Sequence, residues 1–278
     1  MAVMTSEIEQ DRAAITRSLE LLWRGRGPRS RGPKPGLSLE AIVSAAVTLA
    51  DREGLNALSM RKVAAELGVG TMSLYRYVPG KAELLNLMLD HVSAPDDPEA
   101  LKVHETPGEP PAEGWRARLE RIGLGTYRLY LDHPWLLQVN QARPLLGPNA
   151  LLGFEYALAS LNGLGLTGPE KIQIIVTLDA YVTGLARHYV LLRQAGEESG
   201  ISDEEFWEAQ GPAIEGALTS GDFPHVMSLG TDAFSTPAEE ILNFGLTRVL
   251  DGIATFVAAC QAGRPQGAPD PGTAGSCD

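Results

Sequence analysis

The sequence predicts an all-α protein that consists of a small three-helix head and a larger helical body. Apolar residues recur at three- and four-residue steps through most of the 278 residues, as they do on one face of a helix. No run alternates apolar and polar residues with a period of two, so we expect no sheet. The head is organised around residues 58–78, which have the pattern of two short helices joined by a tight turn.

Composition and pattern divide the chain into five parts. They are an N-terminal extension with a basic arm at 1–37, the helix-turn-helix head at 38–92, a linker at 93–114, the body at 115–261 and a disordered tail at 262–278. Proline and glycine are concentrated in the linker and the tail, where they oppose regular structure.

The N-terminal extension contains two kinds of sequence. Residues 6–23 have a helical pattern, with Ser6 and Glu9 at the spacing of a capping box. They form either an accessory helix or an arm that becomes ordered on binding. Residues 24–36 are rich in glycine, proline and basic side chains, so we expect them to be extended. They are either a charged linker or an arm that lies along DNA phosphates or in a minor groove.

The head begins with a predicted helix from Ser38 to Glu53, which ends at Gly54. Ser59 can then cap a second helix by accepting hydrogen bonds from its free amide groups. Gly68 stands where that helix ends in a left-handed turn, a conformation that favours a residue without a Cβ. A third helix is expected from Thr71 to Val78. In a helix-turn-helix, this last helix enters the DNA major groove.

Two further features complete the head. Pro79 and Gly80 end the recognition helix, and residues 81–92 resume as a fourth helix with leucines and a methionine facing inward. Lys81 lies in the first turn of this helix, where a phosphate is favoured by the free amide groups of the helix N-terminus.

The distribution of charge supports DNA binding despite a net charge of −12. Ten arginines and lysines and only four carboxylates lie between Arg24 and Lys81, which gives this segment a net charge of +6 and leaves −18 for the rest. Exposed charges more than about 10 Å away are largely screened, so the local basic segment decides the attraction to phosphates. A basic head on an acidic body is therefore compatible with a DNA partner.

The body is predicted to be helical throughout. The expected helices are 115–132, a short one from His133-Pro134 to Val139, 149–164, 168–195, 203–219 and 237–260. Glycines inside these helices, such as Gly123 and Gly245, either permit close packing or leave space for a cavity, and the sequence does not separate the two.

The composition favours a cytoplasmic globular protein without a cofactor or metal. Hydrophobic residues make up 44% of the chain and charged residues 21%, which is ordinary for such proteins. No apolar run approaches the roughly 20 residues that span a bilayer, so no membrane association is expected. The two cysteines, Cys260 and Cys277, argue against a disulfide framework and a zinc site. Residues 163–168 match the dinucleotide pattern G-x-G-x-x-G but lie between two helices, where we expect a turn.

Four motifs in the head and two in the body follow one another in an order that can be compared with known protein families. They are Ile-Val-x-Ala-Ala from residue 42, Leu-Ser-Met-Arg-Lys-Val-Ala-Ala-Glu-Leu-Gly-Val from 58, Ser-Leu-Tyr-Arg-Tyr-Val from 73, Lys-Ala-Glu-Leu-Leu from 81, and, more loosely, His-Pro-Trp from 133 and Arg-Pro-Leu-Leu-Gly-Pro-Asn from 143. This order resembles the tetracycline-repressor (TetR) family of bacterial regulators. The resemblance implies a repressor that a small molecule releases from operator DNA. It also implies a homodimer in which helices 168–195 and 237–260 form an intersubunit four-helix bundle.

The resemblance also implies the residues that contact DNA. Together with the basic arm, the candidates are Arg29, Arg31, Lys34, Arg61, Thr71, Met72, Ser73, Tyr75, Tyr77 and Lys81. Arg61 can reach a guanine edge, and the serine and tyrosines can bond to bases or phosphates. Tyr75 either faces the DNA or packs into the core of the head with its hydroxyl on a phosphate.

The effector is expected to bind inside the body. The candidates are mostly aromatic, because ligand cavities are mostly apolar with few polar groups: Trp115, Tyr127, Trp135, Asn140, Tyr156, Tyr181 and His188. Phe154 could also supply an aromatic wall. His188 is either a pocket residue or an interface histidine. The family's founding member holds magnesium–tetracycline partly through a histidine, but residues 136–143 contain none. A metal-free effector, an apolar or aromatic natural product or drug, is therefore expected.

Two other classes of protein fit less well. A helical enzyme would need a nucleophile, a base or a metal set at workable spacing, and the sequence contains none. A helical interaction protein without DNA binding would explain the acidic body but not the basic head.

Overall fold

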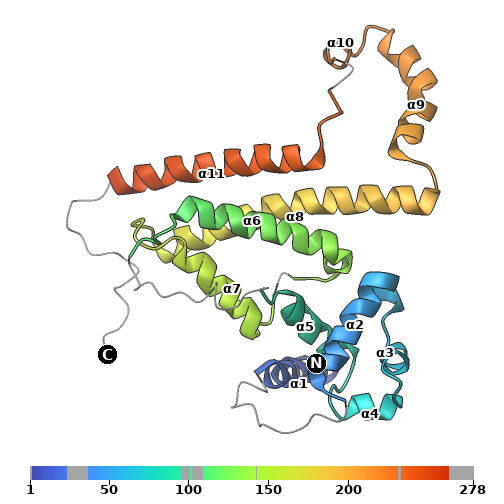
Figure 1. Ribbon diagram of the computed structural model, residues 1–278, viewed down its shortest axis with the longest axis vertical. Coiled ribbons are helices and arrows are strands. Elements are labelled where there is room, and N and C mark those ends of the chain that lie inside the picture. The colour runs from blue at the N-terminus through green and yellow to red at the C-terminus, as the bar shows by residue number, and fades with distance from the viewer. Residues whose placement is uncertain are drawn as a thin grey trace.

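The computed structural model describes residues 2–23, 37–95, 101, 109–141, 143–230 and 233–262, with side chains from residue 12 onward. Every regular element in these ranges is a helix (Figure 1), which confirms the all-α fold class. The basic arm with Arg29, Arg31 and Lys34, most of the predicted linker and the predicted tail lie outside the described residues.

The N-terminal extension forms an accessory helix that packs on the head. Helix α1 (Ala2–Trp23) begins four residues before the expected start, so Ser6 lies inside the helix and does not cap it. It packs along α5 (Lys81–Val92). Arg17 Nε donates to Glu83 Oε1 at 3.4 Å, and leucines from the last turn of α1 join the hydrophobic core.

The head contains the predicted helix-turn-helix. Its elements before α5 are α2 (Leu39–Glu53), the 3-10 helix η1 (Leu55–Ala57), α3 (Met60–Glu66) and α4 (Thr71–Tyr75). Ser38 caps α2 by accepting from the Ala41 amide at 3.1 Å, and Ser59 caps α3 by accepting from the Lys62 amide at 3.3 Å. Gly68 has a φ of 65°, so the left-handed turn between α3 and α4 is confirmed.

The recognition helix is shorter than the sequence indicates. We expected it to reach Val78, but α4 ends at Tyr75. The amides of Tyr77 and Val78 both donate to the Leu74 carbonyl at 2.9 Å, which closes the last turn. Pro79 explains the early end, because a proline disfavours helical backbone in the residue before it.

The body places its helices in layers above the head (Figure 1). In chain order they are α6 (Trp115–Asp132), the 3-10 helix η2 (Pro134–Gln138), α7 (Pro148–Ala159), α8 (Gly168–Ser199), α9 (Asp203–Leu218), α10 (Pro224–Met227) and α11 (Ala238–Ala262). Helix α8 packs against α6, α7 and α11. Helices α9 and α10 project beyond the end of α8 and bury none of their residues in the single chain.

Two boundaries of the body helices differ from expectation. Helix α7 ends at Ala159 and not at residue 164, because the chain enters a turn in which Gly163 and Gly165 have φ values of 69° and 70°. This turn is the segment that matches the dinucleotide pattern, and Thr167 then starts α8 with a capping box. Helix α8 continues to Ser199, four residues beyond the expected end, and Gly200 ends it in the left-handed conformation.

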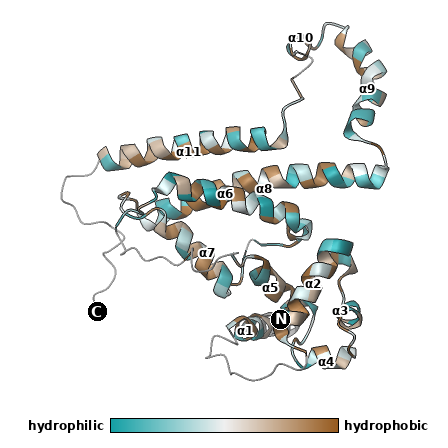
Figure 2. Cartoon of the chain, in the orientation of Figure 1, coloured by the Kyte–Doolittle hydropathy of each residue, from teal (hydrophilic) through white to brown (hydrophobic). Residues whose placement is uncertain are grey.

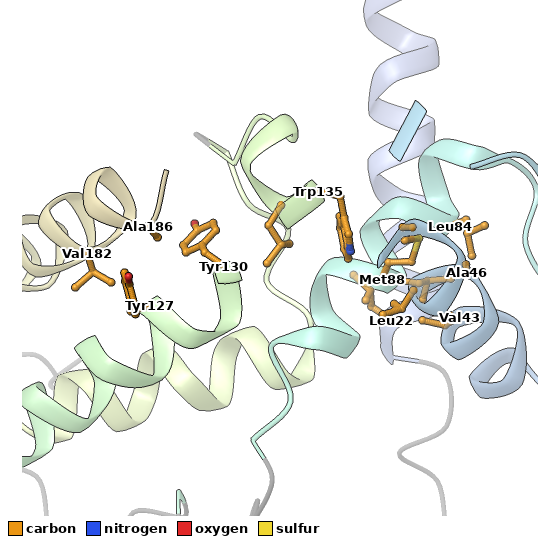
Figure 3. Packing of buried hydrophobic residues seen from close by; sticks show 14 of the residues in the cluster. Leu22, Val43, Ala46, Leu84, Met88, Tyr127, Tyr130, Trp135, Val182 and Ala186 are labelled. Atoms are coloured by element: carbon orange, nitrogen blue, oxygen red, sulfur yellow. The ribbon is translucent and has the colours of Figure 1, made fainter. Parts of the chain in front are cut away.

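A continuous hydrophobic core joins the head to the body. Figure 3 shows one group of side chains around Met88 in the head and another around Tyr127 and Tyr130 in the body, with Trp135 between them. Trp135 is only 2% exposed. The short helix η2 therefore carries the side chain that lies at the junction of the two parts.

Helix α11 corrects the expectation that no segment is long and apolar enough to span a bilayer. By length and composition alone, its 25 residues could do so. Length and composition are weak evidence, however, because core helices of soluble proteins meet the same criteria. One side of α11 packs on α8 and α6 through Leu242, Leu246 and Leu250, while its other residues leave hydrophobic surface uncovered in the single chain (Figure 2).

Candidate functional site

The exposed end of the head carries large side chains that the core does not use. On α4 and the turn after it, Met72 is 74% exposed, Tyr75 44% and Tyr77 38%. Leu74, between Met72 and Tyr75, and Val78, directly after Tyr77, are fully buried and fix the segment to the head. Tyr75 therefore lies on the exposed face and not in the core of the head.

Basic side chains flank this exposed face. Arg61 on α3 and Lys81 at the start of α5 are both exposed. Lys81 Nζ donates to the Leu55 carbonyl at 3.3 Å, and Arg61 has no ion-pair partner among the described residues. Thr71 and Ser73 are partly exposed on α4.

A separate group of ion pairs holds α2 against α3. Lys62 Nζ lies 2.7 Å from Glu53 Oε2, and Arg52 pairs with both Glu53 and Glu66. Hydrogen bonds from Lys62 and Arg52 lower the pKa of the Glu53 carboxyl. These cations are committed to the head itself, whereas Arg61 remains available to an outside partner.

The body contains a cavity of about 230 Å³ enclosed by three helices. Helix α6 contributes Leu119, Ile122, Gly123 and Thr126; α7 contributes Gly153, Phe154 and Ala157; and α8 contributes Ile175, Leu178, Asp179 and Val182. The lining is apolar apart from the hydroxyl of Thr126 and the carboxyl of Asp179. Such a cavity suits a mostly apolar ligand with one or two polar groups.

Of the aromatic side chains that we expected to form cavity walls, Phe154 lines this cavity. None of the seven side chains that we expected to bind the effector is among the lining residues. Tyr127 is buried in the core, and Trp115 packs against it. The Tyr156 hydroxyl accepts from Arg121 at 2.7 Å, and the Tyr181 hydroxyl donates to carbonyls of α11 at 3.1 Å. Asn140 and His188 are exposed, and the His188 ring lies edge-on to Tyr189.

The glycines inside the helices were the best indication of the cavity in the sequence. Gly153 lines it, and a Cβ there would meet nothing within 4 Å. Gly123 also lines the cavity, but a Cβ there would lie 3.1 Å from Leu246 Cδ1, so this glycine permits close packing. At Gly245, a Cβ would overlap the hydroxyl and the ring of Tyr181, so this glycine permits the close packing of α11 on α8. The sequence alone could not distinguish these two roles.

Two carboxylates of the head contact the body. Asp51 Oδ1, on α2, accepts from the Trp135 indole at 2.7 Å and lies 2.8 Å from His133 Nδ1. Asp90, on α5, accepts from the backbone amides of Asn149 and Ala150 at 3.1 and 3.0 Å. We refer to these as the Asp51 contact and the Asp90 cap. The first holds η2, which follows α6, and the second caps the N-terminus of α7.

These two contacts link the cavity to the head. Helices α6 and α7 both contribute cavity walls. The element after α6 and the first turn of α7 are each bonded to a helix of the head. A displacement of either wall is therefore transmitted to α2 or α5.

Comparison with known proteins identifies the family. Residues 42–88 match the family described as bacterial regulatory proteins, tetR family, and residues 106–257 match the tetracyclin repressor-like C-terminal domain. The HTH-type transcriptional repressor DrrR1 of Streptomyces coeruleorubidus is 52% identical over 245 residues, which cover 88% of this chain and 87% of that protein. The chain belongs to the TetR family.

Solved structures of family members have the same fold. Apo ActR from Streptomyces coelicolor matches with a TM-score of 0.63 and 26% identity, over 84% of this chain and all of that chain. ActR in complex with actinorhodin matches with a TM-score of 0.60 and the same identity and coverage. This TetR-family chain is accordingly a DNA-binding transcriptional regulator.

Proposed function

We propose that the dimer represses transcription by binding operator DNA through α4, and that a small molecule in the α6–α7–α8 cavity releases it. The observation that carries this proposal is the link between the cavity and the head. The element after α6 is bonded to Asp51 of the head, and the first turn of α7 is bonded to Asp90 of the head. Repression is the activity named for the DrrR1 relative. We assign the chain no catalytic role and place it in the cytoplasm with the DNA that it binds.

The exposed residues of the head support specific roles at the DNA. Met72 can contact a thymine methyl group, and Arg61 can donate two hydrogen bonds to a guanine edge. Thr71, Ser73, Tyr75 and Tyr77 surround them with hydroxyl groups for bases and phosphates. Lys81 would contribute a phosphate contact without reading sequence, and the basic arm would extend the contact to neighbouring phosphates.

Apolar surface on α8 and α11 supports an intersubunit four-helix bundle. On α8, Val176 is 58% exposed and Leu191 52%, and on α11 Phe244 is 70% exposed. Exposed apolar patches of this kind mark interaction surfaces. A second copy of the same two helices would cover them, and would set the two α4 helices about 34 Å apart for successive major grooves.

Release is expected to follow from a shift between two arrangements of the dimer. The effector must bind the released arrangement more tightly than the DNA-bound one, since a ligand with equal affinity for both shifts nothing. In the ActR complex the bound molecule is actinorhodin. For this chain we propose an aromatic, metal-free effector, because the cavity is apolar and the described residues contain no group of three side chains able to hold a metal.

Operator binding measured against salt tests the regulator function. The wild-type dimer should bind DNA from upstream of its own gene, with an affinity that falls steeply as salt rises. Arg61→Ala should weaken binding and relax the preference for one base pair, while Lys81→Ala should weaken binding to all sequences and reduce the salt slope by about one. Arg128→Ala, an exposed arginine of α6, is the matched control.

Two results would contradict the proposal. One is absent or salt-insensitive binding by the intact dimer. The other is an equal loss of binding in Arg61→Ala, Lys81→Ala and the Arg128→Ala control, because a general charge effect would then explain the loss.

A further inference from the structure

We infer that the effector cavity selects ligands that carry an amine cation on an aromatic body, and that Asp179 is the residue that recognises the cation. The inference rests on the proposed function of the cavity as the effector site. It adds the chemical class of the ligand, which neither the family nor the relatives supply.

The cavity has one charged side chain in an otherwise mostly apolar lining. Asp179 is the only ionisable side chain among the eleven lining residues, and Thr126 is the only other one with a polar side chain. The walls beside Asp179 on α8 are Ile175, Leu178 and Val182. A ligand that fills the apolar space therefore has a carboxylate within reach and one hydroxyl to bond.

Asp179 has no partner within the described residues. It takes part in none of their hydrogen bonds or ion pairs. Burial among the helices raises the pKa of its carboxyl, and no neighbouring cation opposes this shift. Asp179 is exposed to water in the single chain, which solvates its ionised form. A ligand that fills the cavity would displace part of this water, so the site gains from a ligand that supplies a positive charge beside the carboxylate.

No cation of the surrounding helices is among the lining residues of the cavity, and most of these cations are engaged elsewhere. On α8, Lys171 donates to Asn162 at 3.1 Å and Arg187 donates to the Leu137 carbonyl at 3.4 Å. On α6, Arg116 pairs with Asp251 at 2.7 Å, Arg121 pairs with Glu113, and Arg118 lies over the Tyr156 ring. The charge that complements Asp179 is therefore expected from the ligand.

The position of Asp179 gives the orientation of the ligand. Asp179 remains accessible to water in the single chain, whereas Leu119, Leu178 and Val182 are at most 3% exposed. The aromatic part would therefore lie against the leucines and valine, with the amine at the mouth beside the carboxylate. A cavity of about 150 Å³ accepts benzene, so 230 Å³ has room for a bicyclic ring system.

Three probes of nearly equal shape test the charge preference. They are 1-naphthylmethylamine, 1-naphthalenemethanol and 1-naphthoic acid, which are cationic, neutral and anionic at pH 7. Their dissociation constants are measured by calorimetry on the intact dimer for the wild type, for Asp179→Asn, and for Asp203→Asn as the control. Asp203 is an exposed carboxylate in the first turn of α9, outside the cavity.

The wild type and Asp203→Asn should bind the amine about tenfold more tightly than the alcohol, as a charge-assisted hydrogen bond at a partly accessible site would give, and the acid most weakly. In Asp179→Asn the amine and the alcohol should bind equally, with the affinity for the alcohol unchanged. The alcohol thus reports on the cavity and the amine reports on Asp179.

Each contrary result has a distinct meaning. Equal binding of amine and alcohol to the wild type overturns the charge preference but leaves the cavity as a ligand site. A preference for the amine that persists in Asp179→Asn assigns it to another residue. If Asp179→Asn changes dimer dissociation and not selectivity, the carboxylate belongs to the subunit interface. If no probe binds, both the charge preference and the proposed cavity site fail.

Discussion

Replacing Asp90 with alanine should uncap α7 and weaken the contact between head and body. Gly147, the residue before α7, has no side chain that could cap the helix, so the Asp90 carboxylate supplies the cap from α5. Loss of an N-cap costs about 1 kcal/mol, and loss of a carboxylate beside a helix N-terminus costs up to about 1 kcal/mol more. Asn149 Nδ2 keeps its bond to the Asp90 backbone carbonyl at 3.0 Å, so that part of the contact survives. The expected destabilisation is about 2 kcal/mol.

Two measurements check this value. Thermal unfolding of Asp90→Ala should occur about 4–8 °C below that of the wild type, since each kcal/mol lowers Tm by about 2–4 °C in a chain of this size. Exchange of the Asn149 and Ala150 amide protons should be faster by up to about thirtyfold, the factor that corresponds to 2 kcal/mol. Asp90→Asn keeps an oxygen for both amides and should lose roughly half as much.

Ser202→Ala is the matched control for the Asp90 cap. Ser202 caps α9 through a bond from the Glu205 amide at 3.1 Å, but α9 is not packed on the head or the cavity. Its replacement should free the first turn of α9 and leave operator binding unchanged. If Asp90→Ala leaves both the unfolding temperature and the two amide exchange rates at wild-type values, the capping argument is refuted.

Three other substitutions have defined outcomes. Gly245→Ala should displace the ring of Tyr181 and destabilise the α8–α11 packing by about 1–3 kcal/mol in urea unfolding, and an unchanged midpoint would contradict the close approach. Trp135→Phe removes the indole bond to the Asp51 carboxylate and should cost about 2 kcal/mol in the same assay, with His133 remaining as a partner. Desolvation raises the pKa of the Asp179 carboxyl above its ordinary value, so the folded state binds the carboxyl proton more tightly than the unfolded state does. The free energy of unfolding therefore falls as pH rises through the pKa that Asp179 has in the folded protein. Asp179→Asn should therefore unfold at a higher temperature than wild type at pH 7, with the difference vanishing in acid, and a constant difference would exclude this titration.

The parts of the fold that depend on neighbours in the sequence were predicted well. The cap at Ser59 and the left-handed turn at Gly68 each involve a backbone contact within a few residues, so residue type and spacing decide them. The end of α4 was missed for a related reason. Leu74 and Val78 are both buried as the helical pattern requires, but a closed turn before Pro79 places Val78 in the core as well as a helix would.

The cavity was not predictable from the kind of residue alone. We expected several aromatic walls, but Phe154 is the only aromatic side chain among the lining residues. Aromatic side chains bury a large apolar area, and Tyr127, 5% exposed, and Trp135, 2% exposed, fill the core instead. The cavity lies where a small residue, Gly153, leaves open space beside mostly aliphatic side chains. Nothing in the sequence marked Asp179 as a cavity residue, because an acidic residue on a helix is usually solvated.

The contacts between head and body could not be predicted because they join distant parts of the chain. Asp51 and Trp135 are 84 positions apart, and Asp90 and Asn149 are 59 apart. Nothing local distinguishes these two aspartates from the exposed carboxylates of the same helices. Helix α1 adds a third contact of this kind, since the Trp23 indole donates to the Leu146 carbonyl, just before α7, at 3.3 Å.

The energy of the Asp90 cap is of the size that a ligand-controlled switch needs. Coupling between an effector and a second ligand is commonly about 1–3 kcal/mol, which changes affinity by roughly 5- to 150-fold. The cap contributes about 2 kcal/mol, so a ligand that displaces the first turn of α7 enough to break it would change operator affinity within that range. The apolar contact around Trp135 also joins the head to the body, but contacts of this kind yield only gradually to a small displacement. Short polar contacts at Asp51 and Asp90 are lost over a fraction of an ångström, which allows movement of a cavity wall to release the head.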